Sequence, residues 1–234
     1  MIFALTDEIL FPPPQLASED GLLAVGGDLS EERLLLAYSM GIFPWYSEED
    51  PILWWAPDPR LVFELDDLYI SKRLARVIRQ GVFEVRCDTA FAEVIQACSR
   101  KRPGKEEGTW IMPEMVDAYC RLHDLGFAHS VECWREGKLA GGLYGIALGK
   151  IFFGESMFSR QDNASKVALF HLVEMLRKWG FELIDCQVKS EHLVRLGAKE
   201  IPGLEFRQRL KKYAQIDQNP VKWNTDFGGN SNLY

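Results

Sequence analysis

Apolar residues recur at two different spacings along the chain, and each spacing predicts a different element. Intervals of three and four residues favour helices, whereas strict alternation favours strands. The predicted helices occupy residues 26–41, 72–81, 87–100, 112–126, 164–180 and 205–214. The predicted strands occupy residues 60–70, 129–159 and 181–188.

Residues at the ends of these segments support the assignment. Ser30 or Asp28 can cap the first helix, and Gly41 ends it, as Gly126 ends the fourth. Residues 129–159 contain a Glu-Gly-Lys turn and favour an antiparallel meander of three strands. A helix then leads to one further strand. This order predicts an α/β (α+β) fold with a mixed sheet.

Two proline-rich segments divide the chain. Residues 11–21 predict a loop without regular structure, and residues 42–60 hold four prolines and three tryptophans. We expect the second segment to be an ordered loop held by its aromatic rings rather than a helix or a central strand. The pattern predicts a small N-terminal domain over residues 1–60 and a larger α/β domain over residues 61–234, with a loose polar tail from about residue 225.

Composition adds a cellular setting to this picture. The chain has 234 residues, of which 47% are hydrophobic and 26% charged, as in ordinary globular proteins. Its apolar runs are shorter than the ~18 residues of a membrane span, and the acidic start MIFALTDEILF does not resemble a signal peptide. Five scattered cysteines without a C-x-x-C pair favour a reducing compartment. We therefore expect a cytoplasmic protein that does not bind membranes.

Net charge limits the way in which this chain could hold a nucleic acid. A charge of −7 argues against broad coverage of phosphates, so a nucleic-acid partner would be gripped locally. The basic residues form three clusters, each of which could equally be a solvated surface. The clusters are Lys72, Arg73, Arg76 and Arg79; Arg100, Lys101, Arg102 and Lys105; and Arg207, Arg209, Lys211 and Lys212.

Several common reaction centres are disfavoured by the residue spacing. The four histidines have no ligand spacing with acids or cysteines, so no metal site is expected. GESMF begins like a G-x-S-x-G nucleophile elbow, but Phe158 occupies the second glycine position. Residues 160–165 are similar to the loop with which GNAT-type acetyltransferases hold the pyrophosphate of coenzyme A. Asn163 stands at a glycine position there, which favours an acyltransferase architecture whose coenzyme site has been lost.

Three polar residues in apolar segments are candidates for chemistry. Glu155 lies in IFFGESMFS, where it could face solvent or await a cation. In FELIDCQV, alternation puts Asp185 and Gln187 on one face about 7 Å apart. They could be a strand-edge pair exposed to water or part of a site.

A series of motifs in the same order resembles a known family. The motifs are GLLAVGGDLS, GIFPWYS, DPILWWAPDPR, EEGTW, GESMFSR, NASK and LIDCQV, between about residues 11 and 202. They resemble the leucyl/phenylalanyl-tRNA–protein transferases of bacteria. The resemblance implies a GNAT-like acyltransferase domain that uses no cofactor. It also implies transfer of Leu, Phe or sometimes Met from aminoacyl-tRNA to proteins beginning with Arg or Lys, which marks them for degradation.

The resemblance also implies roles for individual residues. Asp185 and Gln187 match the catalytic pair, and Glu155 matches the residue that selects the cationic acceptor. Trp45 and Trp110 match positions that stack around the terminal adenosine of tRNA. The implied aminoacyl pocket consists of Phe152, Phe153, Met157, Leu169 and Ile184. Ideal alternation points Ile184 away from the catalytic pair, so its place there requires a twist or bulge.

Two other classes of protein compete with this interpretation. A binding module with a decayed site should have lost Glu155, Asp185 and Gln187, and a coenzyme-A acyltransferase should keep glycine at position 163. We expect a monomer that holds tRNA by its 3′ end and acceptor stem. The sequence does not decide the preference between Leu and Phe, the basic cluster that meets tRNA, or whether Asp185 is a general base or an orienting residue.

Overall fold

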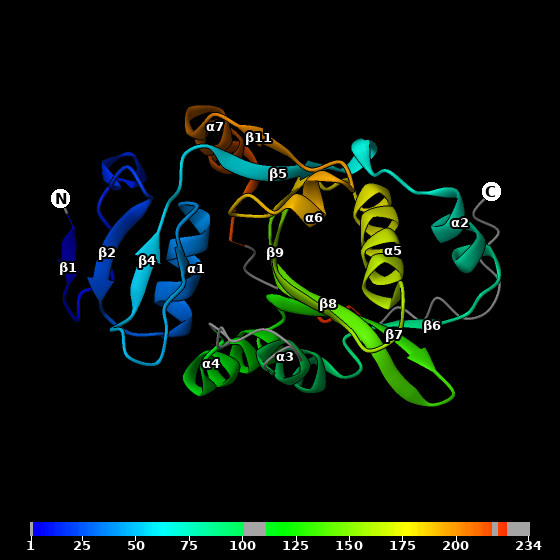
Figure 1. The fold of residues 1–234 in the computed structure, drawn as a ribbon. Coiled ribbons are helices and arrows are strands. Elements are labelled where there is room, and N and C mark those ends of the chain that lie inside the picture. Colours follow the sequence, from blue (N-terminus) through cyan, green and yellow to red (C-terminus); the bar gives the residue numbers. More distant parts are fainter. Residues whose placement is uncertain (1, 101–110, 217–219, 224–234) are drawn as a thin grey trace.

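Two mixed β-sheets organise the chain (Figure 1). The computed structural model describes residues 2–100, 111–216 and 220–223. The smaller sheet has the order β1-β2-β4-β3, with β1 (Phe3–Leu5), β2 (Leu22–Gly26), β3 (Phe43–Pro44) and β4 (Leu53–Trp55). The larger sheet has the order β11-β5-β10-β9-β8-β7-β6. Its strands are β5 (Arg60–Glu64), β6 (Glu84–Cys87), β7 (Ala128–Arg135), β8 (Lys138–Leu148), β9 (Ile151–Ser159), β10 (Leu183–Asp185) and β11 (Lys199–Ile201).

The helices confirm most of the sequence predictions. They are α1 (Glu31–Ser39), α2 (Lys72–Arg79), α3 (Phe91–Ser99), α4 (Pro113–Asp124), α5 (Ala164–Lys178), α6 (Glu191–Val194) and α7 (Gly203–Tyr213), and two 3₁₀ turns span Pro14–Leu16 and Leu65–Asp67. Ser30 is the cap of α1, since its side chain accepts the N–H of Arg33. Gly41 and Gly126 follow their helices with positive φ, as a helix end requires.

The predicted meander and mixed sheet are confirmed. The strands β7, β8 and β9 pair antiparallel in sequence order, and α5 then crosses over to β10, which pairs in parallel with β9. None of the helices in the described ranges is long and apolar enough to cross a bilayer.

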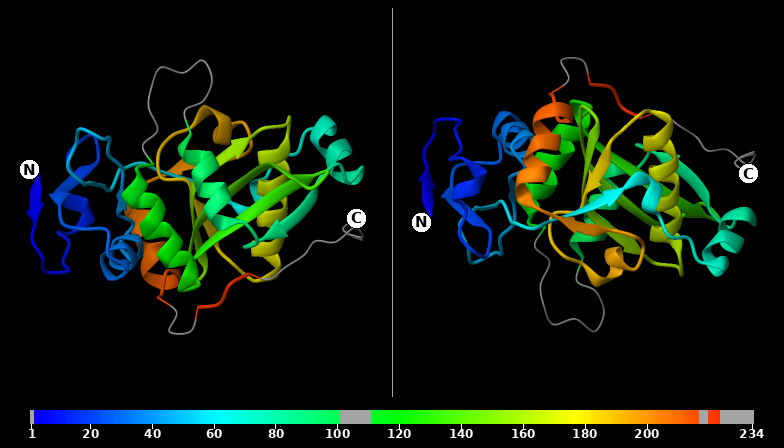
Figure 2. Two further views of the ribbon diagram at one scale, coloured as in Figure 1. Left: turned by 90° about the horizontal axis from the view of Figure 1, so that it is seen from below. Right: turned by 90° about the horizontal axis from the view of Figure 1, so that it is seen from above.

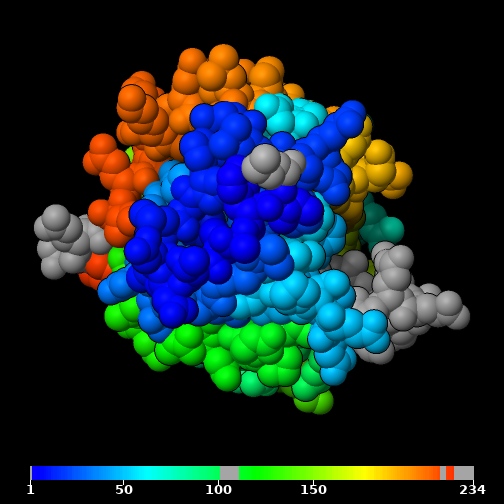
Figure 3. Space-filling model, turned by 90° about the vertical axis from the view of Figure 1, so that its left-hand side faces the viewer, coloured from blue at the N-terminus to red at the C-terminus, as the bar shows by residue number. Residues whose placement is uncertain are grey.

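Helices cover both faces of the larger sheet and create two cores (Figure 2). The first core lies on the side of α3 and α4, and it also takes in α1, α7 and the smaller sheet. The second core lies under α5, between that helix and the opposite face. Figure 3 views the end formed by the smaller sheet, with α7 along one edge and α4 along the other. The domain boundary at residue 60 stays a prediction.

The segment 42–60 was predicted to be an ordered loop without a central strand, and this prediction is wrong. The segment forms β3 and β4, and β4 is an inner strand of the smaller sheet, between β2 and β3. The prolines lie outside Leu53–Trp55, so the three residues of β4 keep the N–H groups that pairing needs. The Trp54 side chain is fully buried, and its Nε1 donates to the carbonyl oxygen of Gly26 at 2.9 Å.

Other short elements escaped the sequence analysis. The strand expected over residues 60–70 ends at Glu64, and the helix expected from residue 87 begins only at Phe91, because Cys87 belongs to β6. The strands β1, β2, β6 and β11 and the one-turn helix α6 were not predicted. Runs of three to five residues are too short for a hydrophobic period to distinguish. The tail from residue 225 lies outside the described residues.

A bulge in β9 interrupts the pairing of the two longest strands. Tyr144 pairs with Ser156 and Gly145 pairs with Gly154, so Glu155 is an extra residue without a counterpart on β8. A bulge exchanges the two faces of a strand for the residues beyond it, because side chains alternate with a period of two.

The two cores show this exchange of faces. Phe152 and Met157 are five positions apart, which alternation would put on opposite faces, yet both belong to the second core. Phe153 belongs to the first core. The bulge therefore brings apolar residues from both of its sides to one face of the sheet.

Gly145 is the residue of β8 that the bulge requires. A Cβ atom at position 145 would lie 2.2 Å from the carbonyl oxygen of Phe153 and 2.6 Å from the Phe152 ring. We expect Gly145→Ala to lower the free energy of unfolding by about 1–3 kcal/mol or more, since neither neighbour can withdraw without disturbing the bulge. Urea unfolding followed by tryptophan fluorescence measures this loss.

Its partner across the strands provides the matched control. A Cβ atom at Gly154 would lie 3.5 Å from Ile184 Cγ2, which is an ordinary contact. Gly154→Ala should therefore cost clearly less than Gly145→Ala. Equal losses for the two variants would contradict the role given to Gly145.

Candidate active site

A cavity opens where β9 and β10 stop pairing. The two strands are paired only over Ile151–Phe153 and Leu183–Asp185. Beyond this point Gly154, Glu155 and Met157 on β9 and Gln187, which follows the end of β10, border a cavity of about 320 Å³. Where the pairing ends, the two segments separate, and both carry side chains into this cavity.

Most of the cavity wall is apolar. The second core contributes residues from β8, β9, α5 and β10: Leu143, Phe152, Met157, Leu169, Leu172 and Ile184. The segment of β3 contributes Phe43, Pro44 and Trp45 on another side. Ser190, His192 and Leu193, around α6, complete the wall. Such a wall suits an apolar side chain of a ligand.

Glu155 brings a carboxyl group to this cavity. Tyr119 Oη donates to Glu155 Oε2 at 3.2 Å, and Gln187 Nε2 donates to Oε1 at 3.1 Å. Tyr119 Oη is in turn hydrogen-bonded to Tyr38 Oη. The two tyrosines come from α4 and α1, so the carboxyl group is held by elements of the first core. Neither tyrosine stands out in the sequence pattern.

The surroundings of Glu155 favour its neutral form. Burial raises the pKa of this carboxyl group to about 8, although the hydroxyls of Tyr38 and Tyr119 oppose the rise. Burial also raises the pKa of both tyrosines well above the ordinary value, so they remain hydrogen-bond donors. In the free protein at neutral pH, the carboxyl group of Glu155 is therefore mostly protonated.

Asp185 makes an ion pair away from water. Its side chain is fully buried, and Arg60 is 1% exposed. Arg60 Nε donates to Oδ1 at 2.8 Å and Arg60 Nη2 donates to Oδ2 at 2.6 Å. This two-point geometry fixes both groups. Asp185 is not among the described residues that line the cavity.

Arg60 is a residue that sequence analysis missed. Its guanidinium lies 4.9 Å from the ring centre of Phe43 and 4.8 Å from that of Phe206. A carboxylate in an apolar strand is costly to bury without a partner, so a paired cation is one way to stabilise it. The sequence does not say which cation, since Arg60 and Asp185 are far apart along the chain.

Gln187 turns the chain into the cavity. Its φ is +57°, a left-handed conformation that ends the strand after Asp185. The backbone N–H of Gln187 donates to Asp185 Oδ1 at 3.0 Å, and this hydrogen bond stabilises the turn. Ile184 and Gln187 both line the cavity as a result. The twist that Ile184 was expected to need is this turn.

Four of the five residues predicted to form the aminoacyl pocket lie at the cavity. Phe152, Met157, Leu169 and Ile184 line the cavity. Phe153 does not, because it points to the first core, where its ring meets that of Tyr38 edge-on at 5.2 Å. The roles of these residues in binding stay predictions.

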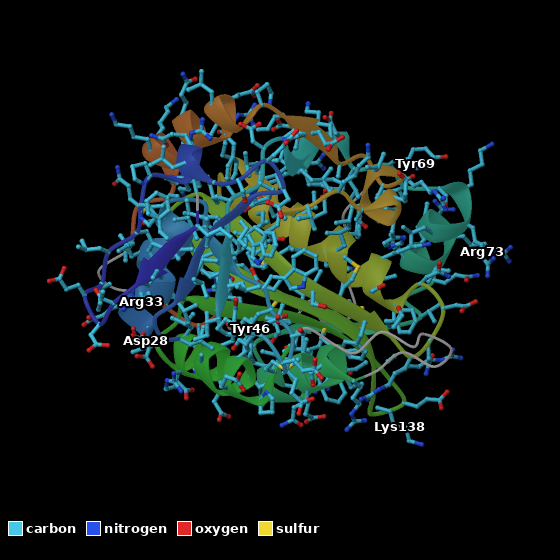
Figure 4. All side chains as sticks on the ribbon, turned by 60° about the vertical axis from the view of Figure 1, so that its left-hand side comes forward. Asp28, Arg33, Tyr46, Tyr69, Arg73 and Lys138 are labelled. Carbon is cyan, nitrogen blue, oxygen red and sulfur yellow. The ribbon has the colours of Figure 1, made fainter. Side chains whose placement is uncertain are left out.

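Of the two tryptophans predicted to stack on adenosine, the structure describes Trp45. Trp45 is 40% exposed and lies at the cavity, with its ring 5.8 Å from that of Trp55. Trp110 lies outside the described residues. Tyr46, labelled in Figure 4, donates to Glu114 Oε1 at 3.0 Å and so joins the segment next to Trp45 to α4.

The loop before α5 contains Asn163 at the position where the coenzyme-A loop would have glycine. Asn163 has a φ of +70°, the left-handed conformation that a glycine position implies. The N–H of Ser165 donates to Ser159 Oγ at 2.9 Å.

Arg73, labelled in Figure 4, is 78% exposed at the outer edge of α2. In the described ranges, His, Cys, Asp and Glu side chains form no group of three that could bind a metal ion.

Comparisons with known proteins agree over nearly the whole chain. The family model described as leucyl/phenylalanyl-tRNA protein transferase matches residues 62–211, and the model of its N-terminal domain matches residues 27–58. A protein of Syntrophobacter fumaroxidans with the same name is 61% identical over 205 residues, 88% of each chain. One from Anaeromyxobacter sp. (strain Fw109-5) is 57% identical over 228 residues, 97% of each chain.

A solved structure gives a weaker likeness. The crystal structure of an aminoglycoside acetyltransferase from an uncultured soil metagenomic sample is 14% identical, with a TM-score of 0.38, and the match covers 62% of this chain and 97% of that one. The family match does not depend on this likeness, since it covers more than half of the sequence. The chain belongs to the leucyl/phenylalanyl-tRNA protein transferase family.

Proposed function

We propose that the chain transfers Leu or Phe, and less often Met, from aminoacyl-tRNA to the α-amine of proteins that begin with Arg or Lys, and so marks them for degradation. It acts in the cytoplasm as a monomer and without a cofactor. The observation that carries this proposal is a single cavity with an apolar wall on one side and the carboxyl group of Glu155 on the other.

The donor side chain occupies the apolar part of the cavity in this proposal. Phe152, Leu169 and Ile184 supply flat and branched surfaces, and Met157 adds a flexible one that can adapt to two shapes. The terminal adenosine of the tRNA stacks on Trp45 at the cavity and on Trp110. A stacking contact holds the 3′ end without reading much sequence, which suits a chain of net charge −7.

The acceptor places its cationic first side chain against Glu155. Attraction between an ammonium or guanidinium group and a carboxylate is strong where water is scarce. Because the carboxyl group of Glu155 is mostly protonated in the free protein, binding of the cation must displace its proton. Binding of the matching acceptor therefore favours the ionised form of Glu155, which the free protein disfavours.

The reaction is aminolysis of an ester and requires no covalent intermediate on the enzyme. The neutral α-amine attacks the ester carbonyl carbon, a C–N bond forms, and the bond to the 3′ oxygen of tRNA breaks. The amine proton passes to that oxygen. Gln187 borders the cavity and can hydrogen-bond the amine or the developing oxyanion. Holding the two substrates together supplies much of the acceleration.

Asp185 acts on this reaction through Gln187. Both of its oxygens are engaged by Arg60, and Oδ1 also accepts the backbone N–H of Gln187. Its burial behind the cavity wall supports an orienting role rather than direct removal of the amine proton.

The first experiment tests the proposed reaction and its acceptor. Labelled leucine should pass from leucyl-tRNA to an Arg-starting peptide without coenzyme A. Glu155→Gln should lower kcat/KM for this peptide at least about a hundredfold, because breaking a buried ion pair costs about 3–5 kcal/mol. It should also lose the preference for Arg-starting over Ala-starting peptides, yet bind a leucyl-adenosine analogue almost normally.

Asp185→Asn is the control for this test. The variant should transfer slowly but keep the preference for Arg-starting peptides, since the selecting carboxyl group is intact. Retention of that preference by Glu155→Gln would show that the selecting residue lies elsewhere.

The raised pKa of Glu155 predicts how stability depends on pH. Between the ordinary pKa of 4.5 and the folded value of about 8, the native state keeps a proton that the unfolded state has lost. The free energy of unfolding contributed by this group therefore falls as pH rises, by at most about 1.4 kcal/mol per pH unit. Glu155→Gln should match the wild type near pH 4.5 and be the more stable protein near pH 8.

Thermal or urea unfolding of the free protein measures this difference. Transfer rates would not isolate it, because the acceptor amine itself titrates at about pH 7.7–8.0. A stability difference between the two proteins that does not change with pH would contradict the neutral form of Glu155.

The buried ion pair predicts a test by double substitution. Arg60→Met leaves the carboxylate of Asp185 buried alone and should cost about 3–5 kcal/mol of stability. Adding Asp185→Asn removes the stranded charge and should recover most of that loss, as urea unfolding would show. The double variant should still transfer slowly, because the amide oxygen that replaces the carboxylate accepts the N–H of Gln187 less strongly and Arg60 no longer fixes its position. Recovery of the wild-type rate together with stability would contradict the orienting role.

A further inference from the structure

The wall residue Phe152 is supported from behind by a residue outside the cavity. Phe152 is fully buried and lines the cavity. Its ring lies against Gly145, where a Cβ atom would be 2.6 Å from both Cε1 and Cζ. On another side, the ring centre of Trp223 lies 5.7 Å from that of Phe152, with the two planes tilted by 33°. Trp223 itself is not among the described residues that line the cavity.

Gly145 makes this contact possible. On β7 its partner is His129, whose ring is stacked with that of Trp223 at 3.9 Å and 3°. A Cβ atom at position 145 would lie 2.6 Å from the Phe152 ring, so a side chain there would push this ring out of its place. Without one, Trp223 and Phe152 meet over the backbone of β8.

Trp223 is held in place by several independent contacts. Its backbone N–H donates to Asp88 Oδ2 at 2.6 Å, and the same carboxylate oxygen is 2.8 Å from Nδ1 of His129. The rings of Trp179 and Phe181 meet that of Trp223 edge-on at 5.1 and 6.5 Å. At 8% exposure Trp223 belongs to the second core. A residue fixed on so many sides is a firm support for its neighbour.

We infer that Trp223 is a positioning residue that sets the depth of the donor pocket by holding the ring of Phe152. The inference rests on the proposed function, because it takes the cavity as the site of the donor side chain. Residues 220–223, red in Figure 2, lie beyond residue 211, where the match to the family model ends. The C-terminal segment would thus adjust donor selectivity without contacting the donor.

The test compares donor selectivity in two tryptophan variants of the full chain. Trp223→Ala removes the support, so the Phe152 ring can withdraw and the cavity can enlarge. The ratio of kcat/KM for phenylalanyl-tRNA to that for leucyl-tRNA should rise about tenfold, the lower end of what one methylene contributes in an apolar pocket. Trp179→Ala removes one of the rings that meet Trp223 and leaves the Trp223 ring beside Phe152, so it should change the ratio clearly less than Trp223→Ala.

Leu169→Ala, which alters the cavity wall directly, separates the possible failures. If it changes the donor ratio and Trp223→Ala does not, the inference is wrong and the donor pocket stands. If neither variant changes the ratio, the donor pocket and the inference are both wrong. An equal change in Trp179→Ala would also overturn the inference, because the contact with Phe152 would not be its cause.

Folding is checked by thermal unfolding before any rate is compared. Should Trp223→Ala fail to fold, Trp223→Leu keeps part of the apolar volume, and we expect a smaller rise of the ratio in the same direction. An unchanged ratio in a folded Trp223→Leu protein would contradict the inference in that case.

Discussion

The bulge at Glu155 is the constraint on which the site depends. In a regular strand, Glu155 would pair with β8 and the residues on its two sides would keep strict alternation. The extra residue leaves Glu155 unpaired and turns Met157 to the face that Phe152 already occupies. Gly145 makes room for this arrangement on β8. One irregularity in pairing therefore produces both the carboxyl group and the apolar wall of the cavity.

Two acids on adjacent strands, Asp185 fully buried and Glu155 partly buried at the cavity, are stabilised in opposite ways. Asp185 has a permanent counter-ion in Arg60, which the rings of Phe43 and Phe206 enclose. Glu155 accepts hydrogen bonds from the neutral donors Tyr119 and Gln187 and makes no ion pair with any residue that the structure describes. A residue that needs an external cation in order to ionise is suited to recognising one. A residue that already has its cation is suited to holding backbone in place.

Much of the fold could be predicted from the sequence, because long amphipathic segments have an unambiguous period. The meander, the capped helix α1 and the long helix α5 follow from local pattern. Short strands such as β4 and β11 could not be predicted, since tertiary pairing decides them. Within the site, the glycines at 145 and 154 were a signal for the bulge, since isolated glycine in a strand indicates one. The partners Arg60, Tyr38 and Tyr119 gave no signal, because side-chain contacts between distant segments are not encoded in local spacing.

In the proposed function, the two cores divide the selection of donor and acceptor between them. The apolar wall of the cavity comes largely from the second core, under α5, whereas the tyrosines that hold Glu155 come from α1 and α4 in the first. The sheet separates these two sets of residues, and the cavity joins them only where β9 and β10 part. Changes to packing beneath α5 can therefore alter the fit of an apolar donor without moving the carboxyl group. Changes in α1 or α4 can alter the acceptor side while the apolar wall stays intact, so the two specificities can vary independently in one small chain.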